Sequence, residues 1–239
     1  MEKKNLFLNQ RMIEFIQIFG ERCSGTNYIE NLICKNYQVS ITYAFGWKHW
    51  YIDFKQFANA NVSCENVLFI VIVRNPYDQL RSLSLEPHHA PFHYNISFSD
   101  FLRREWKSYE SEHHTWFHPD INERNKCIKE GVLIEHESNV CTLRNKKNKN
   151  FLELKNYVKH FLVINYEDIL FNYTSITIIE DFNIQRRTNN IINITNQKGI
   201  HDETFKMKEY NLIEENDILF INTTLDWYVE NKLGYTMSL

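Results

Sequence analysis

The chain has 239 residues, a length that suits one α/β domain with a full core and leaves little room for a second. With 27 Lys and Arg residues against 30 Asp and Glu residues, the net charge of −3 argues against a nucleic-acid-coating or polybasic membrane-anchored protein. A content of 43% hydrophobic and 15% aromatic residues excludes a disordered chain, so we predict one domain over residues 1–239.

The lengths of the apolar runs and the spacing of the cysteines indicate the cellular compartment of the protein. The longest strongly apolar run, residues 67–73, is far shorter than the roughly 20 residues that cross a bilayer. Residues 1–19 contain no signal-peptide core. Five cysteines without a Cys-x-x-Cys pair favour neither a disulfide framework nor a zinc ribbon. We therefore expect a cytoplasmic protein with no membrane span, no bound metal and no nucleic-acid partner.

The pattern repeats an arrangement of strand, polar loop and helix. Residues 14–19 read as a strand, followed by a turn-rich stretch to Thr26 and a helical pattern from Ile29. Residues 67–73 form a second, fully buried strand that ends at Arg74-Asn75-Pro76 and leads into another helix. Residues 161–164 are a third apolar strand.

The other segments are less regular. Residues 97–109 have the pattern of an N-capped amphipathic helix. Residues 146–150 are predicted to be a polar, basic loop, and residues 183–204 to be irregular. Residues 214–233 predict one closing helix.

Three apolar strands, each followed by polar residues and then a helix, predict an α/β fold. We expect a central parallel sheet with helices on both faces, which makes a three-layer sandwich. In such sheets ligands lie beyond the carboxyl ends of the strands. The loops that follow the strands are therefore the places to look for a site.

The first loop, Gly20-Glu21-Arg22-Cys23-Ser24-Gly25-Thr26-Asn27-Tyr28, combines glycines, hydroxyls and a cation before a helix start. Backbone N–H groups and the helix dipole there suit a phosphate or sulfate, although an ordinary capped turn has the same composition. The nucleoside triphosphatase P-loop ends in Gly-Lys-Ser/Thr. The absence of a Lys after Gly25 argues against a kinase.

The second loop follows the most apolar strand. Arg74 leaves that strand at its carboxyl end, and Ser82 lies eight residues later, about two turns into the next helix. An Arg and a hydroxyl can grip one phosphate, the Arg by planar, charge-assisted donors. A helix-capping salt bridge is the alternative interpretation of Arg74.

Together the two loops resemble those of sulfotransferases that use 3′-phosphoadenosine 5′-phosphosulfate (PAPS). The resemblance rests on Ser24-Gly25-Thr26, on Arg74-Asn75-Pro76 with Ser82, on Tyr166-Glu167-Asp168 and on Lys198-Gly199, and it covers residues 13–235. It implies a P-loop-like loop in which residues 22–27, Cys23 and Asn27 included, hold the 5′-phosphosulfate. It also implies that Arg74, Ser82, Lys198 and Gly199 bind the 3′-phosphate, and that Tyr28 and Tyr166 flank the adenine.

The sequence departs from that family at one position. Many relatives place a Lys or Arg directly before Ser-Gly-Thr, where this chain has Cys23, which we interpret as a neutral loop thiol. Arg22 and Lys48 are the candidates for the cation at the bridging oxygen.

His49 is the candidate general base, because it lies between the two loops and a hydroxyl acceptor must lose a proton. Glu21 and Glu30 are the alternatives. Lys48 is adjacent, and in an extended segment the side chains of Lys48 and His49 would point to opposite faces. The His-rich stretches 88–93 and 113–118 favour an aromatic acceptor wall over a zinc site.

The sequence thus predicts an enzyme that moves a sulfuryl group from PAPS to a hydroxyl, less favourably an amine, of a glycan or small-molecule acceptor. The product is adenosine 3′,5′-bisphosphate. A nucleotide- and glycan-binding protein without turnover and a P-loop kinase are the rival interpretations.

Overall fold

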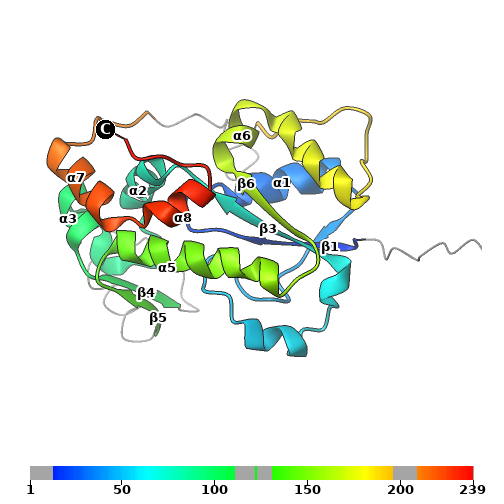
Figure 1. Ribbon diagram of the computed structural model, residues 1–239, viewed down its shortest axis with the longest axis horizontal. Coiled ribbons are helices and arrows are strands. Elements are labelled where there is room, and N and C mark those ends of the chain that lie inside the picture. The colour runs from blue at the N-terminus through cyan, green and yellow to red at the C-terminus, as the bar shows by residue number, and fades with distance from the viewer. Residues whose placement is uncertain (1–12, 111–121, 123–130, 196–208, 239) are drawn as a thin grey trace, which may run out of the picture.

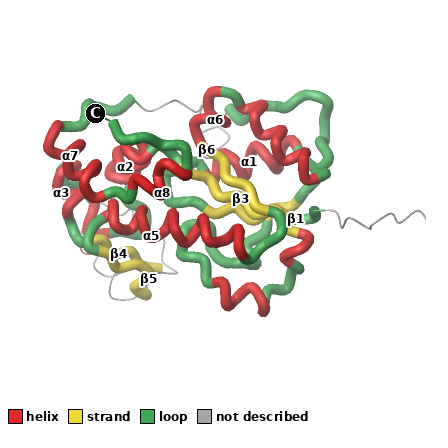
Figure 2. Tube along the Cα trace, in the orientation of Figure 1, coloured by secondary structure: helices red, strands yellow, loops and turns green. Residues whose placement is uncertain are grey.

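The computed structural model describes residues 13–110, 122, 131–195 and 209–238. These residues form a parallel four-stranded sheet in the order β2-β1-β3-β6. The strands are β1 (Phe15–Phe19), β2 (Ser40–Ile41), β3 (Val67–Val73) and β6 (Phe161–Asn165). A separate antiparallel pair, β4 (Trp106–Glu110) and β5 (Val132–Glu137), lies apart from that sheet (Figure 2).

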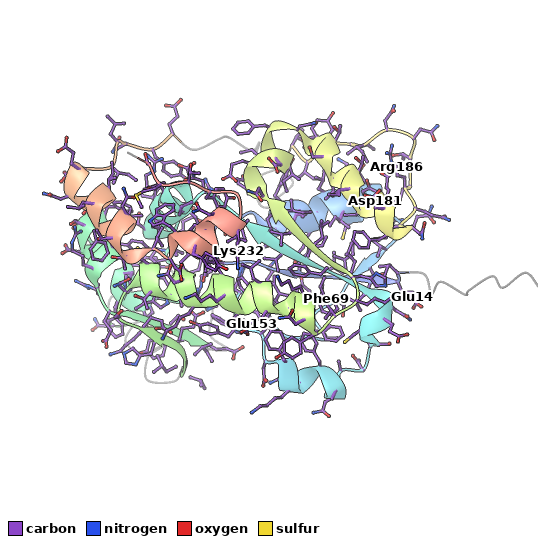
Figure 3. All side chains as sticks on the ribbon, in the orientation of Figure 1. Glu14, Phe69, Glu153, Asp181, Arg186 and Lys232 are labelled. Carbon is purple, nitrogen blue, oxygen red and sulfur yellow. The ribbon has the colours of Figure 1, made fainter. Side chains whose placement is uncertain are left out.

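The central strand β3 shows why this sequence forms a sheet. All seven of its residues are buried, which is typical of a parallel strand covered on both faces. Its side chains alternate between two hydrophobic clusters, with Ile70 in one and Phe69 and Val71 in the other. Figure 3 shows Phe69 in the interior, and its cluster includes Phe151 of the helix that follows β5.

Helices cover both faces of the sheet (Figure 1). The cluster of Ile70 contains residues of α1 and α6, whereas the cluster of Phe69 contains residues of α5 and α8. The helices are α1 (Thr26–Asn36), α2 (Pro76–Leu85), α3 (Phe98–Arg103), α5 (Val140–Glu153), α6 (Tyr166–Phe171), α7 (Glu215–Thr224) and α8 (Trp227–Lys232). The predicted α/β architecture with a central parallel sheet is therefore confirmed, and it is compatible with a three-layer sandwich.

Short 3₁₀ helices join these elements. They are η1 (Phe54–Asn59), η2 (Cys64–Asn66), η3 (Pro91–His93), η5 (Leu154–Asn156) and η6 (Tyr173–Phe182). A third hydrophobic cluster joins α2, α3, β4 and α7, with Leu80, Phe101, Trp106 and Ile221 fully buried. This cluster fixes the hairpin of β4 and β5 to the rest of the domain.

The prediction of one helix over residues 97–109 was wrong. Ser97 caps α3 as expected, but the helix ends at Arg103, and Trp106 begins β4. The Trp106 indole is fully buried, and its Nε1–H donates to Glu135 of the paired strand β5. Tertiary pairing with a distant strand therefore overrides the helical pattern.

Two further predictions were wrong. Residues 146–150 belong to α5 rather than to a loop, because Asn139 caps the helix and Lys147 is used in the interior. The closing segment 214–233 is two helices, because the chain is extended at Leu225 and Asp226 begins α8 as its cap. Residues 183–195 are irregular, as predicted, and residues 196–204 lie outside the described residues.

Candidate functional site

The first and second loops meet at the carboxyl ends of β1 and β3. Gly20 ends β1 in close contact with β3, since a Cβ atom there would lie 2.6 Å from the carbonyl oxygen of Ile72. At the end of β3, Arg74 reaches back, and its Nη1 donates to the carbonyl oxygen of Cys23 at 2.9 Å. The parallel sheet therefore brings the two predicted anion loops into direct contact.

Part of the backbone of the first loop is already hydrogen-bonded, since the N–H groups of Arg22 and Ser24 donate to Glu21. Cys23 and Gly25 have positive φ angles of 64° and 88°, a conformation that turns successive N–H groups toward one side. Helix α1 starts at Thr26 without a side-chain cap and without an acidic residue in its first turn. The positive end of the helix dipole is therefore not neutralised by its own first turn, which favours an anion there.

Gly25 lets an aromatic ring approach this loop. A Cβ atom at Gly25 would lie 2.2 Å from Cδ2 of Tyr166, the first residue after β6. Tyr28 meets the same ring edge-to-face, with centroids 6.3 Å apart. Because the two predicted adenine-binding rings touch each other, a purine can lie between them only if this contact opens.

The second loop is braced by residues of the Tyr-Glu-Asp segment. Asn75 caps α2 by accepting hydrogen bonds from the N–H groups of Tyr77 and Asp78. The N–H of Asn75 donates to Glu167, whose other oxygen accepts from the Tyr235 hydroxyl. Glu167 therefore links the start of α2 to Tyr235, a structural role that the sequence alone did not indicate.

Arg74 lies over the ring of Tyr166, with its guanidinium carbon 5.0 Å from the ring centroid. Its Nη2 donates to the Tyr210 hydroxyl at 3.2 Å. Among residues 13–110, 122, 131–195 and 209–238, no carboxylate forms an ion pair with Arg74, so a capping salt bridge does not describe it. Ser82 lies buried two turns along α2.

Arg22 has a different environment from the one expected of a loop cation. Its side chain is 1% exposed, and its terminal nitrogens lie 2.7 Å from Glu21 and 2.5 Å from Glu135. The guanidinium lies against the rings of Trp50 and Trp106, at 5.1 and 5.5 Å. Both terminal nitrogens are therefore committed to carboxylates, and Arg22 anchors the first loop to β5.

Lys147 completes this buried cluster, which consists of Glu21, Arg22, Glu135 and Lys147. Its Nζ lies 2.8 Å from Glu21, contacts Glu135, and donates to the carbonyl oxygen of His49. Two carboxylates and two cations balance each other. The sequence did not reveal this cluster, because Glu135 and Lys147 lie more than 100 residues from the loop and carry no motif.

Lys48 and His49 both reach the first loop and α1. The Lys48 ammonium donates to Asn27 at 2.6 Å and to Glu30 at 2.7 Å, beside the first turn of α1. The extended arrangement that would have separated the two side chains is not present. Residues 47–50 form a turn, in which the N–H of Trp50 donates to the Trp47 carbonyl.

His49 is held in the form that a general base needs. Its Nδ1 lies 2.8 Å from the carbonyl oxygen of Gly20. Because a carbonyl only accepts, Nδ1 carries the hydrogen, and Nε2 keeps its lone pair. Burial, together with Arg22, Lys48 and Lys147, lowers the pKa of His49 well below 6.5, so the ring is neutral at pH 7.

The alternative bases are less suited to the role. Burial alone would raise the pKa of Glu21, but Lys147 and Arg22 outweigh it and hold the carboxyl ionised. Glu30 has one oxygen on Lys48 and the other on the Tyr43 hydroxyl. Both carboxylates are therefore occupied by partners, whereas the hydrogen bond of the His49 ring to Gly20 uses Nδ1 and not Nε2.

The aromatic side chains near His49 differ from the predicted wall. Tyr43 and Trp47 are 45% and 43% exposed with ring centroids 5.5 Å apart, and Trp47 meets His49 edge-to-face. By contrast, His93 is fully buried against Phe101 and Trp106. It therefore belongs to the core and not to a wall. Residues 113–118 and the predicted phosphate-binding pair Lys198 and Gly199 lie outside the described residues.

Comparisons with models of known protein families and with curated proteins found no match for this chain. Within the described ranges, no three His, Cys, Asp or Glu side chains come close enough together to hold a metal ion. No described helix is long and apolar enough to cross a membrane.

Proposed function

We propose that this protein is a sulfotransferase that uses PAPS as donor and a hydroxyl group as acceptor. The observation that carries the proposal is the contact between the two loops. Arg74, which lacks a carboxylate partner in the described chain, reaches the loop in which α1 begins without a cap side chain. Two sites suited to anions thus lie close together, as a nucleotide with a 5′-phosphosulfate and a 3′-phosphate requires.

The residues divide between the two ends of the donor. The first turn of α1, with the hydroxyls of Ser24 and Thr26, supplies donors for the 5′-phosphosulfate. Arg74 and Ser82 supply the 3′-phosphate site. Lys48 replaces Arg22 as the proposed cation at the bridging oxygen, because Lys48 contacts the first turn of α1 and pairs with one carboxylate, Glu30, while Arg22 is held by both Glu21 and Glu135.

His49 takes up the proton in the transfer step. The acceptor oxygen attacks sulfur, its proton moves to Nε2 of His49, and the bond from sulfur to the bridging oxygen breaks. The electron pair of that bond stays on the departing adenosine 3′,5′-bisphosphate, where Lys48 stabilises the developing charge. The Gly20 carbonyl fixes the Nδ1–H tautomer, so the imidazole is oriented before the acceptor binds.

The aromatic pair Tyr43 and Trp47 is the proposed acceptor platform. Both rings are exposed, Trp47 lies beside His49, and Tyr43 lies beside Trp47. The segment between them is held by the strand beneath it. Gln17 in β1 accepts from the N–H of Phe45 and donates to the carbonyl of Gly46. A rigid exposed ring beside a base suits the apolar face of a sugar or a flat hydroxylated molecule.

Calorimetry with adenosine 3′,5′-bisphosphate, combined with a sulfate-transfer assay over a panel of acceptors, tests the proposal. We expect binding by the wild type, and a loss of about 2–4 kcal/mol of binding free energy in Arg74→Ala, the scale of a charge-assisted pair. Binding without transfer to any acceptor would support the binding-protein alternative. Tighter binding of ATP with magnesium would support a kinase and overturn the assignment.

A further inference from the structure

Tyr210 contacts two arginines, Arg74 at the end of β3 and Arg81 in α2. The guanidinium carbons of Arg74 and Arg81 lie 6.0 and 4.9 Å from the centroid of the Tyr210 ring. The Tyr210 hydroxyl accepts from Arg74, and the neighbouring carbonyl of Asn211 accepts from Arg81 at 2.9 Å. Tyr210 thus holds both cationic side chains against one aromatic ring, next to Tyr166.

Arg81 is not fully satisfied by these contacts. Its Nη2 lies 2.5 Å from Asp78 one helical turn earlier, and its side chain is 23% exposed. Its Nε atom is buried, and no described residue accepts a hydrogen bond from it. Buried donors without partners are rare in folded proteins, and an acceptor on a bound ligand is one way to satisfy this donor.

The charges at this position do not balance. Arg74 and Arg81 contribute two positive charges, and Asp78 is the single described carboxylate that forms an ion pair with either of them. By contrast, the buried cluster of Glu21, Arg22, Glu135 and Lys147 balances to zero. An excess positive charge held on ordered, partly buried arginines costs less when an anion binds beside them.

We infer that Arg81 is a second phosphate-binding residue beside Arg74, and that Tyr210 is a positioning residue which orients both. The ligand is a phosphate monoester, because two guanidinium groups match the oxygens of a doubly charged phosphate. The inference rests on the proposed function, in which this group is the 3′-phosphate of the donor. It makes Arg81 a residue that distinguishes a 3′-phosphorylated nucleotide from one without that group.

Equilibrium binding of two probes tests this role. Adenosine 3′,5′-bisphosphate carries the group that Arg81 is inferred to contact, and adenosine 5′-monophosphate lacks it. We expect Arg81→Gln to weaken the bisphosphate by about 10- to 100-fold, the effect of one charge-assisted contact, and to leave the monophosphate unchanged. Tyr210→Phe, which keeps the ring and loses the hydroxyl, should reduce the same preference by about 3- to 10-fold.

Arg103→Gln is the matched control. Arg103 also lies 2.5 Å from an aspartate, Asp217, and its guanidinium carbon is 4.6 Å from the centroid of Phe220. It is on α3, away from the second loop, so both affinities should remain at the wild-type value. General loss of structure would weaken both probes together, whereas the inferred contact changes only their ratio.

Two results would overturn the inference in distinguishable ways. If the wild type prefers the bisphosphate and Arg81→Gln keeps that preference, the role of Arg81 is refuted while the proposed function stands. If the wild type binds both nucleotides equally or neither, the proposed function fails, and the assignment of Arg81 fails with it.

Discussion

Replacing Lys147 by Met tests whether the buried charge cluster holds the first loop in place. The Lys147 side chain has no exposed surface, and its ammonium lies between Glu21 and Glu135. Removing it leaves two carboxylates with one cation, Arg22, in the interior. Breaking a buried ion pair in this way costs about 3–5 kcal/mol, because an uncompensated charge remains without water.

The neighbouring residue supplies the control. Lys146 belongs to the same helix, but its side chain is 58% exposed and its single ion pair is with Glu137. Lys146→Met should therefore cost no more than about 1 kcal/mol, as surface ion pairs do. Urea denaturation of both variants, followed by far-UV circular dichroism, measures the two free energies of unfolding.

A second variant separates charge balance from packing. Lys147→Met combined with Glu135→Gln removes one charge of each sign, so the pair Glu21 and Arg22 remains balanced. We expect the double variant to be about 1–3 kcal/mol more stable than the sum of the two single effects. Equal destabilisation by Lys146→Met and Lys147→Met, or strict additivity in the double variant, would refute the reasoning.

Three further outcomes follow from the geometry. His49→Gln should reduce sulfate transfer by about 10²- to 10⁴-fold without changing nucleotide affinity. Because the pKa of His49 is lowered in the wild type, the wild-type rate should stay constant from pH 8 to 6.5 and decline only below pH 6.5. Trp47→Ala should raise the acceptor KM by about 10-fold with kcat preserved, whereas Tyr228→Ala, which removes a more exposed aromatic side chain on α8, should not. Burial lowers the pKa of His93 to about 4, so the folded state resists its protonation and stability is lost as pH falls below 6.5. Between pH 7.5 and 5 the wild type should lose about 2 kcal/mol more than His93→Gln in urea titrations.

The parallel sheet was predictable because its signals are local. A run such as residues 67–73, apolar at every position, has few alternatives to a strand covered on both faces, and Pro76 fixes where the next helix begins. The two loops followed from this, since a parallel sheet places the ends of its strands at one edge. Arg74 could therefore be placed beside the first loop before its contacts were known.

The parts that failed depend on pairing between distant segments. Trp106 fits a helical pattern, but it is extended because its backbone pairs with Glu137 of the distant strand β5, while its indole donates to Glu135 of the same strand. Lys147 lies in a polar run that favours a loop, and its burial depends on two carboxylates from other elements. A single sequence does not show which charges will meet, so Arg22 was expected at the anion and not in the core.

The interior also decides how the two loops are held relative to each other. Gln79 donates to the backbone carbonyl of Arg22, and its own side-chain oxygen accepts from Arg144 at 3.3 Å. Arg144 donates as well to the carbonyl of Arg74, and its guanidinium forms a bidentate pair with Glu230. One buried series of hydrogen bonds therefore joins the backbone of both loops. Because these hydrogen bonds hold the two loops in place without a ligand, binding of a ligand across both loops would cost little conformational entropy.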